Sequence, residues 1–541
     1  MSYKAVINKK ITSVKCREIF DLLYILEDDS KLMSLTMTLS ECIINTACIF
    51  CAGLAVWIPV GEGGQVVILQ KTGKKRWRFI PLRFMLYVVL YAAFFGIMGL
   101  SNWQLWTLSR TAGVTILTFT VLLTVMLSVY GGYDIGKRKS KPVISSLIIA
   151  VTLTDLVSYL QLQIMNVNAA NNSTLVLLGF DFVLLLCAIA VQILAIILFT
   201  RIGNKLYFDV HPPAKCCIIA SSREAANHVA LKLSRYRLQY AVQDMVIYSA
   251  SNVRKCIQRS DTVFFAEIPA EQKNRLLSYC YEQQKNVYVT ADLYDVMVAN
   301  GQQVILDDSP FIAMGKGDLE IHEQLIKRMM DVVISAIALI LLSPFMLLAA
   351  VAILIEDGRP VFFKQDRMTI GGKIFKIVKF RTMRKDKGGA QPQRSVRQND
   401  ERITRVGRFL RKYRVDELPQ FINIFKGEMS LVGPRPEMLE NIEQYIKAYP
   451  AFAYRQKMKA GLTGHAQIEG RYNTTAKDKL MMDMMYIENY SVWLDVKLLL
   501  RTLTVFFKTG DSTQGFHAVD DAYSHAKSSL NEMEAEVSEH A

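Results

Sequence analysis

The chain has 541 residues, of which 51% are hydrophobic and only 21% are charged. This composition excludes a disordered chain and is too apolar for an ordinary soluble enzyme, so we expect part of the chain to lie in a membrane. The 64 Lys and Arg residues exceed the 49 Asp and Glu residues, which gives a net charge of +15. Such a surplus indicates an anionic partner, either nucleic acid, lipid or substrate, and composition does not choose among them.

Four stretches are long and apolar enough to cross a bilayer, which takes about 20 residues per helix. They are Ile80–Leu100, Thr111–Tyr130, Pro142–Ile164 and Thr174–Thr200. Basic clusters at residues 71–78, 137–141 and 201–205 flank alternate spans, so all of them lie on one face of the membrane. The positive-inside rule makes that face cytoplasmic and places the chain after Arg201 there.

Other polar and apolar features in this half of the chain leave alternatives open. The earlier apolar run Leu35–Val60 is broken by Ser, Glu and Thr, and we interpret it as soluble or interfacial. Asp155 and Asp181 lie within predicted spans. Acids in a membrane are often functional, but these two are equally interpretable as pairing partners between helices.

A fifth apolar run, Asp331–Ile355, has basic residues on both sides, beginning with Lys327 and Arg328. Both of its ends therefore favour the cytoplasmic face. Ser343 and Pro344 lie at its midpoint, where proline removes a backbone hydrogen bond and the serine hydroxyl can satisfy a freed backbone group. We predict a re-entrant membrane hairpin with its hinge at these two residues. The alternative is a kinked full span, which would place everything downstream outside the cell.

Residues 207–314 alternate short β-branched runs with polar helical runs, which predicts a Rossmann-like α/β module. The expected strands are Cys216–Ala220, Thr262–Ile268, Asn286–Thr290 and Val304–Leu306, with helices such as Glu224–Arg235 and Ala270–Gln284 between them. The turn Ser221–Glu224 after the first strand contains no glycine. A dinucleotide site requires a glycine-rich turn there, so we predict a non-catalytic module for regulation or assembly.

The segment after the hairpin is basic and rich in glycine, and it carries the adjacent acids Asp416 and Glu417. No cysteine follows Cys280, which excludes a thiol nucleophile there. Adjacent carboxylates among cations fit two roles, a nucleophile toward phosphorus and a ligand for a divalent cation, and we expect the cations to keep Asp416 ionised. The alternative is that both acids merely favour a helix N-terminus, and spacing alone does not decide.

Two turns downstream present arginines. Gly427–Glu437 predicts a rigid loop, because prolines on both sides of Arg435 fix its backbone, and the planar guanidinium can grip a diphosphate. Arg471 ends a second glycine-containing turn that begins near Gly461. His465 in that turn is more typical of a structural histidine than of a catalytic one.

Taken together, these motifs resemble the bacterial polyprenyl-phosphate phosphoglycosyl transferases of the monotopic type. The resemblance covers residues 324–509 and rests on the Ser343–Pro344 hairpin, KFRTM at Lys379, RITRVGRFLR at Arg402, DELPQ at Asp416, KGEMSLVGPRP at Lys426 and TGHAQIEGR at Thr463. The spans and the α/β module ahead of it are similar in architecture to the long form of this family, which starts exopolysaccharide, capsule or O-antigen repeat units.

The resemblance implies that Asp416 attacks the β-phosphate of a UDP-sugar, that UMP leaves, and that the phosphosugar passes to undecaprenyl phosphate. It implies that Glu417 helps hold Mg²⁺ and that the sugar is a hexose such as galactose or glucose. The implied phosphate or uridine diphosphate contacts are Lys379, Arg381, Arg435 and Arg471. Thr369, His465 and Glu469 depart from the family pattern and bear on the strand turn and the sugar contacts.

We therefore predict a membrane protein of α and α/β class in the bacterial inner membrane, with its catalytic domain on the cytoplasmic face. The expected parts are an N-terminal segment 1–79, four transmembrane helices in 80–200, the α/β module 201–320, a catalytic domain 321–510 with re-entrant helix 331–355, and a polar tail 511–541. The expected partners are a UDP-sugar, undecaprenyl phosphate and membrane lipid, with no nucleic acid and with a possible homodimer. The alternatives are a non-catalytic scaffold of a polysaccharide assembly complex and an enzyme acting on other lipid phosphates.

Overall fold

The computed structural model describes residues 80–107, 109–131, 140–169, 179–299, 301–314, 319–384, 402–470 and 474–506. The predicted segments 1–79 and 511–541 lie outside these ranges, and with them the run Leu35–Val60. Two compact units divide the chain: one contains residues up to Val121 together with Asp155–Gln192, and the other contains the rest.

Long apolar helices form the N-terminal part of the described chain. They are α4 (Ile80–Met98), α5 (Arg110–Tyr130), α6 (Ser140–Ala169) and α7 (Phe180–Val210), with the 3₁₀ turn η3 (Trp103–Trp106) after α4. By length and composition α5, α6 and α7 are each able to cross a membrane. The apolar stretch found in α4, Met85–Met98, is shorter than a full span. The four helices overlap the four predicted spans.

The two acids within these helices pair with glutamines. The Gln192 amide donates to Asp155 at 3.3 Å and to the Leu90 carbonyl of α4 at 3.1 Å, and the Gln163 amide donates to Asp181 at 2.8 Å. Asp155 and Gln192 are fully buried. Hydrogen bonds of this kind join apolar helices, so the contacts support the interpretation of both acids as pairing partners.

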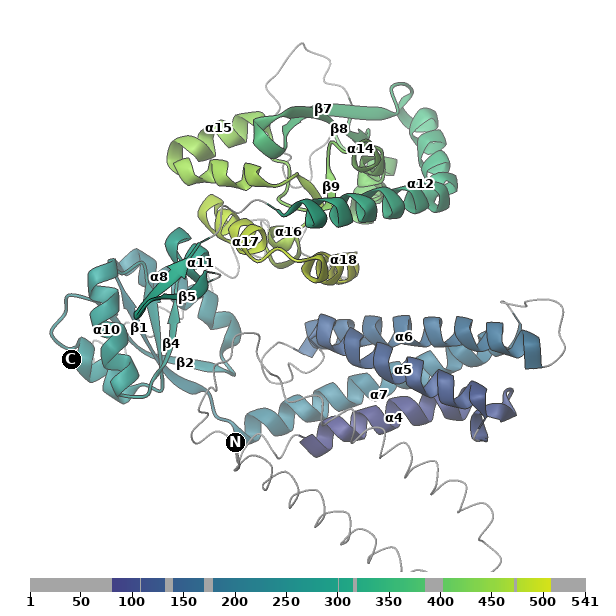
Figure 1. Cartoon of the computed structure of the whole chain (residues 1–541), viewed down its shortest axis with the longest axis horizontal. Coiled ribbons are helices and arrows are strands. Elements are labelled where there is room, and N and C mark those ends of the chain that lie inside the picture. Colours follow the sequence, from purple (N-terminus) through teal and green to yellow (C-terminus); the bar gives the residue numbers. More distant parts are fainter. Residues whose placement is uncertain are drawn as a thin grey trace, which may run out of the picture. The chain divides into compact units, whose positions relative to one another are not determined.

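The middle of the chain forms the predicted parallel sheet with helices (Figure 1). Its strands are β1 (Ala214–Ala220), β2 (Tyr240–Ile247), β3 (Thr262–Ala266) and β4 (Asn286–Val289), in the order β2-β1-β3-β4. Its helices are α8 (Arg223–Leu233), α9 (Val253–Arg259), α10 (Ala270–Glu282) and α11 (Leu293–Ala299), with η4 (Ser234–Tyr236) after α8. In the turn after β1, the Ser222 hydroxyl accepts a hydrogen bond from the Ala225 amide and so caps α8.

Two features of this module correct the sequence prediction. Strand β2 was not predicted, because Gln243 and Asp244 interrupt its apolar pattern. The predicted strand Val304–Leu306 belongs to β5 (Gln302–Leu306), but β5 pairs antiparallel with β6 (Ser309–Ala313) as a separate hairpin. It therefore does not extend the parallel sheet.

The C-terminal region begins with the 37-residue helix α12 (Ile321–Asp357), which leads into the antiparallel strands β7 (Phe362–Met368) and β8 (Ile374–Phe380). The 3₁₀ turn η5 (Ile370–Gly372) joins the strands. The following elements are α13 (Arg405–Lys412), η6 (Val415–Glu417), α14 (Gln420–Lys426), β9 (Ser430–Val432), α15 (Leu439–Ala448), η7 (Pro450–Lys457), β10 (Gly461–Thr463), α16 (His465–Glu469), α17 (Ala476–Glu488) and α18 (Val492–Phe506). Strands β9 and β10 are parallel, and side chains from β8, β9, α14 and α17 share one apolar core.

Helix α12 starts ten residues before the predicted re-entrant run, and its ribbon changes direction part-way along its length (Figure 1). Pro344 lies inside the helix, and its missing N–H leaves the Ile340 carbonyl without its usual partner. The Ser343 hydroxyl donates to that carbonyl at 2.8 Å. Large apolar side chains around the bend, such as Ile340 and Phe345, are 73% and 62% exposed. Helix α12 thus combines a satisfied proline bend with an uncovered apolar surface.

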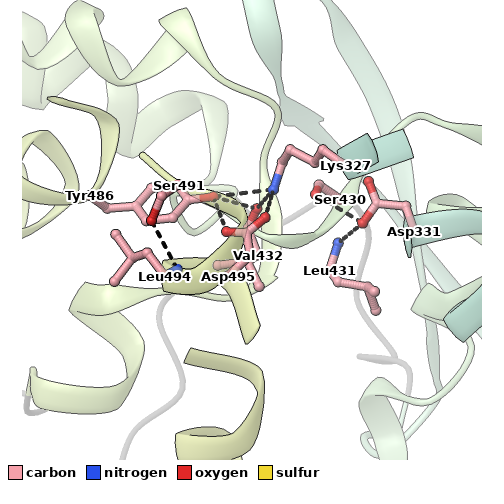
Figure 2. Close-up of polar contacts among 9 residues, drawn as sticks. All are labelled: Lys327, Asp331, Ser430, Leu431, Val432, Tyr486, Ser491, Leu494 and Asp495. Atoms are coloured by element: carbon pink, nitrogen blue, oxygen red, sulfur yellow. Dashed lines mark hydrogen bonds and ion pairs between the residues drawn. The ribbon is translucent and has the colours of Figure 1, made fainter. Parts of the chain in front are cut away.

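The N-terminal part of α12 is fixed to the rest of the domain by buried polar contacts (Figure 2). The Lys327 ammonium, which is 6% exposed, donates to Asp495 at 2.6 Å, to the Val432 carbonyl at 2.9 Å and to the Tyr486 hydroxyl at 3.1 Å. Arg328 donates to two carbonyls at the end of α14. We counted both residues as charges flanking the membrane run. Lys327 is buried in an ion pair instead, so it is not available to lipid headgroups.

One helical turn further along α12, Asp331 binds strand β9 (Figure 2). Its Oδ1 accepts hydrogen bonds from the Leu431 amide at 2.8 Å and from the Ser430 hydroxyl at 3.1 Å. Residues four apart on a helix lie on the same face, so Lys327 and Asp331 contact β9 together. We call Lys327, Asp331, Ser430, Tyr486 and Asp495 the Lys327 cluster.

Candidate active site

Asp416 and Glu417 lie in η6, between α13 and α14. The Thr404 side chain caps α13 by accepting from the Gly407 amide, and the helix ends before Arg414, which adopts a left-handed conformation with φ 55°. This turn presents the acids away from a regular α-helix. Successive residues of a 3₁₀ turn point in different directions, so the two carboxylates have different surroundings.

The Glu417 carboxylate is held by three cations. The Lys379 ammonium of β8 donates to Oε1 at 2.8 Å, the Arg435 guanidinium lies 3.7 Å from the same oxygen, and the Arg414 guanidinium lies 3.7 Å from Oε2. Burial alone would raise the pKa of Glu417, but Lys379, Arg435 and Arg414 outweigh it and lower the pKa to about 2. Glu417 is therefore a fixed anion at any physiological pH.

The Asp416 carboxylate has a different environment. Burial raises the pKa of Asp416 to about 6, repulsion from Glu417 adds to this, and Lys379 and Arg411 oppose it. We expected neighbouring cations to keep Asp416 ionised, and a carboxyl with this pKa is mostly ionised at pH 7, although burial outweighs the effect of these cations on the pKa. Within the described part of the chain, no other side chain donates a hydrogen bond to this carboxylate, although a hydrogen bond from its own backbone amide also lowers the pKa of Asp416.

A hollow of about 240 Å³ opens beside Glu417, and the adjacent Asp416 is not among its lining residues. It is lined by Arg367, Ile377, Lys379, Glu417, Gln420, Arg435, Pro436, Gly461, Leu462 and Gln467. Three of its residues are cationic and one is anionic, so the hollow favours an anionic ligand. Lys379 and Arg435, predicted from separate motifs, meet here on Glu417.

Arg381 is placed elsewhere. It is 8% exposed, and its guanidinium donates to the Asp357 and Gly358 carbonyls at 2.6 and 2.7 Å and pairs with the Asp357 carboxylate at 3.0 Å. These contacts hold the C-terminal end of α12, and Arg381 does not line the hollow. Arg471 lies outside the described residues, and Ser343 and Pro344 lie at the bend of α12.

Sequence reasoning missed two residues of the hollow, Arg367 and Gln467. Arg367 on β7 donates to the Pro436 carbonyl at 3.1 Å. Both Arg367 and Arg435 line the hollow; burial lowers the pKa of Arg367 to about 10, and the positive charge of Arg435 contributes. The amide oxygen of Gln467 is buried without a hydrogen-bond partner among the described residues. Nothing in the local sequence brings these segments together.

The departures from the family pattern have structural partners. The Thr369 hydroxyl accepts a hydrogen bond from the Ala460 amide at 3.1 Å and so ties the β7–β8 turn to the segment before β10. Glu469 pairs with Arg501 of α18. Burial lowers the pKa of the His465 side chain on the same short helix, which favours its neutral form.

The sequence profile of the family described as bacterial sugar transferase matches residues 322–509. A UDP-glucose:undecaprenyl-phosphate glucose-1-phosphate transferase of Caulobacter vibrioides is 42% identical over 194 residues, which cover 34% of this chain and 71% of the relative. A UDP-N-acetylgalactosamine-undecaprenyl-phosphate N-acetylgalactosaminephosphotransferase of Aeromonas hydrophila is 43% identical over 183 residues, 33% of this chain and 43% of the relative. A UDP-glucose:undecaprenyl-phosphate glucose-1-phosphate transferase of Escherichia coli K12 is 34% identical over 277 residues, 50% of this chain and 57% of the relative.

The hollow and nearly all of helix α12 thus lie within residues 322–509, the segment that the family profile matches. The chain belongs to the bacterial sugar transferase family, as its motifs predicted. The matched segment spans about half the length of the Aeromonas and Escherichia relatives.

Proposed function

We propose that the protein transfers a sugar 1-phosphate from a UDP-sugar to undecaprenyl phosphate. The observation that carries this proposal is the unequal acid pair: Glu417 is bound by cations, whereas the adjacent Asp416 carboxylate makes no ion pair or side-chain hydrogen bond within the described residues. Binding of cations to Glu417 keeps it from competing as a nucleophile. Asp416 remains free to attack a phosphorus atom held in the cationic hollow.

The reaction proceeds in two displacements at one phosphorus atom. In the first, an Asp416 carboxylate oxygen forms a bond to the β-phosphorus of the UDP-sugar, the bond from that phosphorus to the bridging oxygen breaks, and UMP leaves with that oxygen. In the second, an oxygen of undecaprenyl phosphate attacks the aspartyl-phosphosugar and releases the Asp416 carboxylate. The products are UMP and undecaprenyl diphosphate-sugar. Each displacement forms one phosphorus–oxygen bond and breaks one, with no oxidation or reduction.

Lys379 and Arg435 have separate roles in this scheme, and Arg367 adds a third positive charge to the hollow. Positively charged groups aimed at the transferring phosphoryl group stabilise the charge that develops on its oxygens. The planar guanidinium of Arg435 suits bidentate contact with a diphosphate, whereas the Lys379 ammonium acts as a point charge between substrate and Glu417. Because Arg381 is bound to the end of α12, we assign it a structural role here rather than the substrate contact suggested by the resemblance.

Mg²⁺ is the proposed cofactor, with Glu417 as its protein ligand; to hold the ion, Glu417 would exchange part of its contact with Lys379, Arg435 and Arg414 for it. Among the residues described, no group of three or more His, Cys, Asp or Glu side chains comes together. The donor chemistry still fits, because Mg²⁺ commonly uses one or two carboxylates and completes its shell with substrate phosphates and water. A bound ion would offset phosphate charge in the transition state.

The proposed setting is the bacterial cytoplasmic membrane, with the site on the cytoplasmic face. The uncovered apolar surface of α12 supports a membrane setting, because a helix of this length and composition is able to enter a bilayer. We propose that the hollow then faces the leaflet that carries the acceptor lipid. We propose a hexose donor, glucose or galactose, for exopolysaccharide, capsule or O-antigen assembly. The names of the relatives give glucose in two cases and N-acetylgalactosamine in the other, so a test must include all three sugars.

The test uses the full chain in detergent with Mg²⁺ and undecaprenyl phosphate, offered separately UDP-glucose, UDP-galactose and UDP-N-acetylgalactosamine. We expect UMP release from one of them and none from D416N. Absence of UMP release with every donor, from protein shown to be folded, would reject the proposal for these sugars and favour the scaffold alternative.

A further inference from the structure

The loop that carries Arg435 is held through its carbonyl groups. Proline lacks an N–H, so Pro434 and Pro436 offer only carbonyls for hydrogen bonding. Each of three consecutive carbonyls receives a hydrogen bond from a different segment: Pro434 from the Gly461 amide at 2.9 Å, Arg435 from the Arg455 guanidinium at 2.9 Å, and Pro436 from the Arg367 guanidinium at 3.1 Å. The loop is therefore fixed at three successive points.

Arg455 is itself fixed by a buried ion pair. Its Nε donates to Asp483 Oδ2 at 2.6 Å, and the two side chains are 6% and 2% exposed. The guanidinium carbon also lies 4.6 Å from the centroid of the Phe452 ring. Asp483 comes from α17 and Arg455 from η7, so the pair connects two segments far from the acids in sequence. One branch of the guanidinium binds Asp483 and another, Nη2, binds the Arg435 carbonyl.

This arrangement does more than join two elements. Removing two charges from water is costly, and buried ion pairs are often replaceable by apolar residues without loss of stability. An apolar pair at these positions would leave the Arg435 carbonyl without its donor. A lysine would also fail, because its single ammonium lacks the planar fork that spans Asp483 and the carbonyl together.

The Arg435 side chain is 42% exposed and extends toward the hollow, where it lies 3.7 Å from Glu417 Oε1. A long exposed side chain gains its position mainly from its backbone, so the fixed carbonyl determines where the guanidinium can reach. We propose that Asp483 and Arg455 are positioning residues for Arg435, which set the place of its guanidinium beside the acid pair. This inference rests on the proposed function of Arg435 as a diphosphate contact.

Substitution of the pair tests this role. We expect R455K and D483N each to lower kcat/KM for UMP release, with about a tenfold loss for R455K, because displacements near 1 Å at a reacting group have effects of this size or larger. R501K is the matched control, since it also weakens an Arg–carboxylate pair of the same domain but does not contact the Arg435 loop. We expect kcat/KM of R501K to stay within about twofold of that of the unsubstituted protein, because the Arg435 guanidinium keeps its position in this variant.

A double substitution separates positioning from general damage. If Arg455 acts through Arg435, then R455K has little further effect once the Arg435 side chain is absent, and R435A/R455K should equal R435A within about twofold. A general disturbance would multiply the two losses instead. Multiplied losses, or R455K and D483N as active as R501K, would overturn the proposal. Should R455K fail to fold, the nearly isosteric D483N in the R435A background decides in the same way.

Binding of UDP supplies a readout that does not depend on turnover. We expect R455K and R435A to weaken UDP affinity in titration calorimetry of the full chain in detergent, and R501K to leave it unchanged. If the unsubstituted protein releases no UMP from any donor but R455K weakens UDP binding, the proposed function fails for those donors while the positioning role stands. If UMP is released normally and R455K changes neither kcat/KM nor UDP affinity, the positioning role fails alone.

Discussion

Two groups of side chains in the C-terminal domain each combine two carboxylates with a lysine, and they differ in how completely the carboxylates are paired. In the Lys327 cluster, Asp495 and Asp331 are bound by the Lys327 ammonium, a hydroxyl and a backbone amide (Figure 2). In the acid pair, Lys379 binds Glu417, while Asp416 accepts no side-chain hydrogen bond within the described residues. In the Lys327 cluster both carboxylates are bound by neighbouring protein groups. In the acid pair, Asp416 has no side-chain partner among the residues described and is the carboxylate that we assign to the substrate.

The difference teaches how the same residue types serve structure and chemistry. A closed buried network has no capacity left, so it holds elements together. A carboxylate that lacks a side-chain hydrogen bond and has a raised pKa, beside a hollow lined by cations, is typical of a functional site. The contrast leads to opposite expectations for substitutions in the two groups.

The largest effect is expected at Asp416. D416N removes the nucleophile without changing the size of the side chain, so UMP release should fall by at least about a thousandfold. The measurement is the initial rate of UMP release with the active donor. The matched control is D366N, an exposed Asp→Asn change on β7 of the same domain, which should keep near-normal activity. Comparable losses in both variants would contradict the assignment.

The next largest effect is expected for K379Q. Removing the ammonium takes away a cation from both Glu417 and the transferring phosphoryl group, and a single such group typically contributes about a hundredfold in rate. K376Q, on the same strand but exposed and three residues away, is the control. Equal rates for K379Q and K376Q would show that Lys379 takes no part in the reaction.

The pH dependence tests the environment of Asp416. The ionised carboxylate is the nucleophile, and burial raises the pKa of Asp416 to about 6, so the rate should fall about tenfold per pH unit below that value. Lys379 lowers the pKa of Asp416, so K379Q should move this acid limb to higher pH. Initial rates of UMP release between pH 5 and 8 give the acid limb of the unsubstituted protein and that of K379Q. An unchanged or downward-shifted limb in K379Q would have the wrong sign for this account.

The smallest effect on catalysis is expected for the Lys327 cluster. K327M leaves buried Asp495 without its cation and should lower the free energy of unfolding by about 3–5 kcal/mol, whereas kcat per folded molecule should stay within about twofold. K327M/D495L, which replaces both charges, should recover much of the stability. Thermal unfolding in detergent and the rate of UMP release check the two parts. If K327M folds but loses as much activity as K379Q, the Lys327 cluster and the acid pair do not differ in the way this account proposes.

The sequence was informative wherever a local pattern decides the outcome. The apolar helices follow from the length of the apolar runs, the bend of α12 follows from Ser343 and Pro344, and the acid pair stands out in its motif. The pairing partners of Asp155 and Asp181 did not follow, because a glutamine on another helix leaves no local signal.

Long-range placement explains what the sequence did not show. Lys379 and Arg381 are two residues apart and look equivalent, but β8 ends at Phe380, so Arg381 leaves the strand and binds the end of α12. Arg367 and Gln467 reach the hollow only through the packing of β7 and α16 around the Arg435 loop. The raised pKa of Asp416 depends on burial and on Glu417, and a count of nearby cations misses both.

The most direct test of the central claim is to trap the covalent intermediate. The full chain, incubated with the active UDP-sugar in the absence of undecaprenyl phosphate, is denatured, digested and examined by mass spectrometry. The account predicts one sugar phosphate on the peptide that contains Asp416, its loss on addition of the lipid, and no adduct in D416N. Stoichiometric UMP release with an adduct on another residue, or sustained release by D416N, would contradict it.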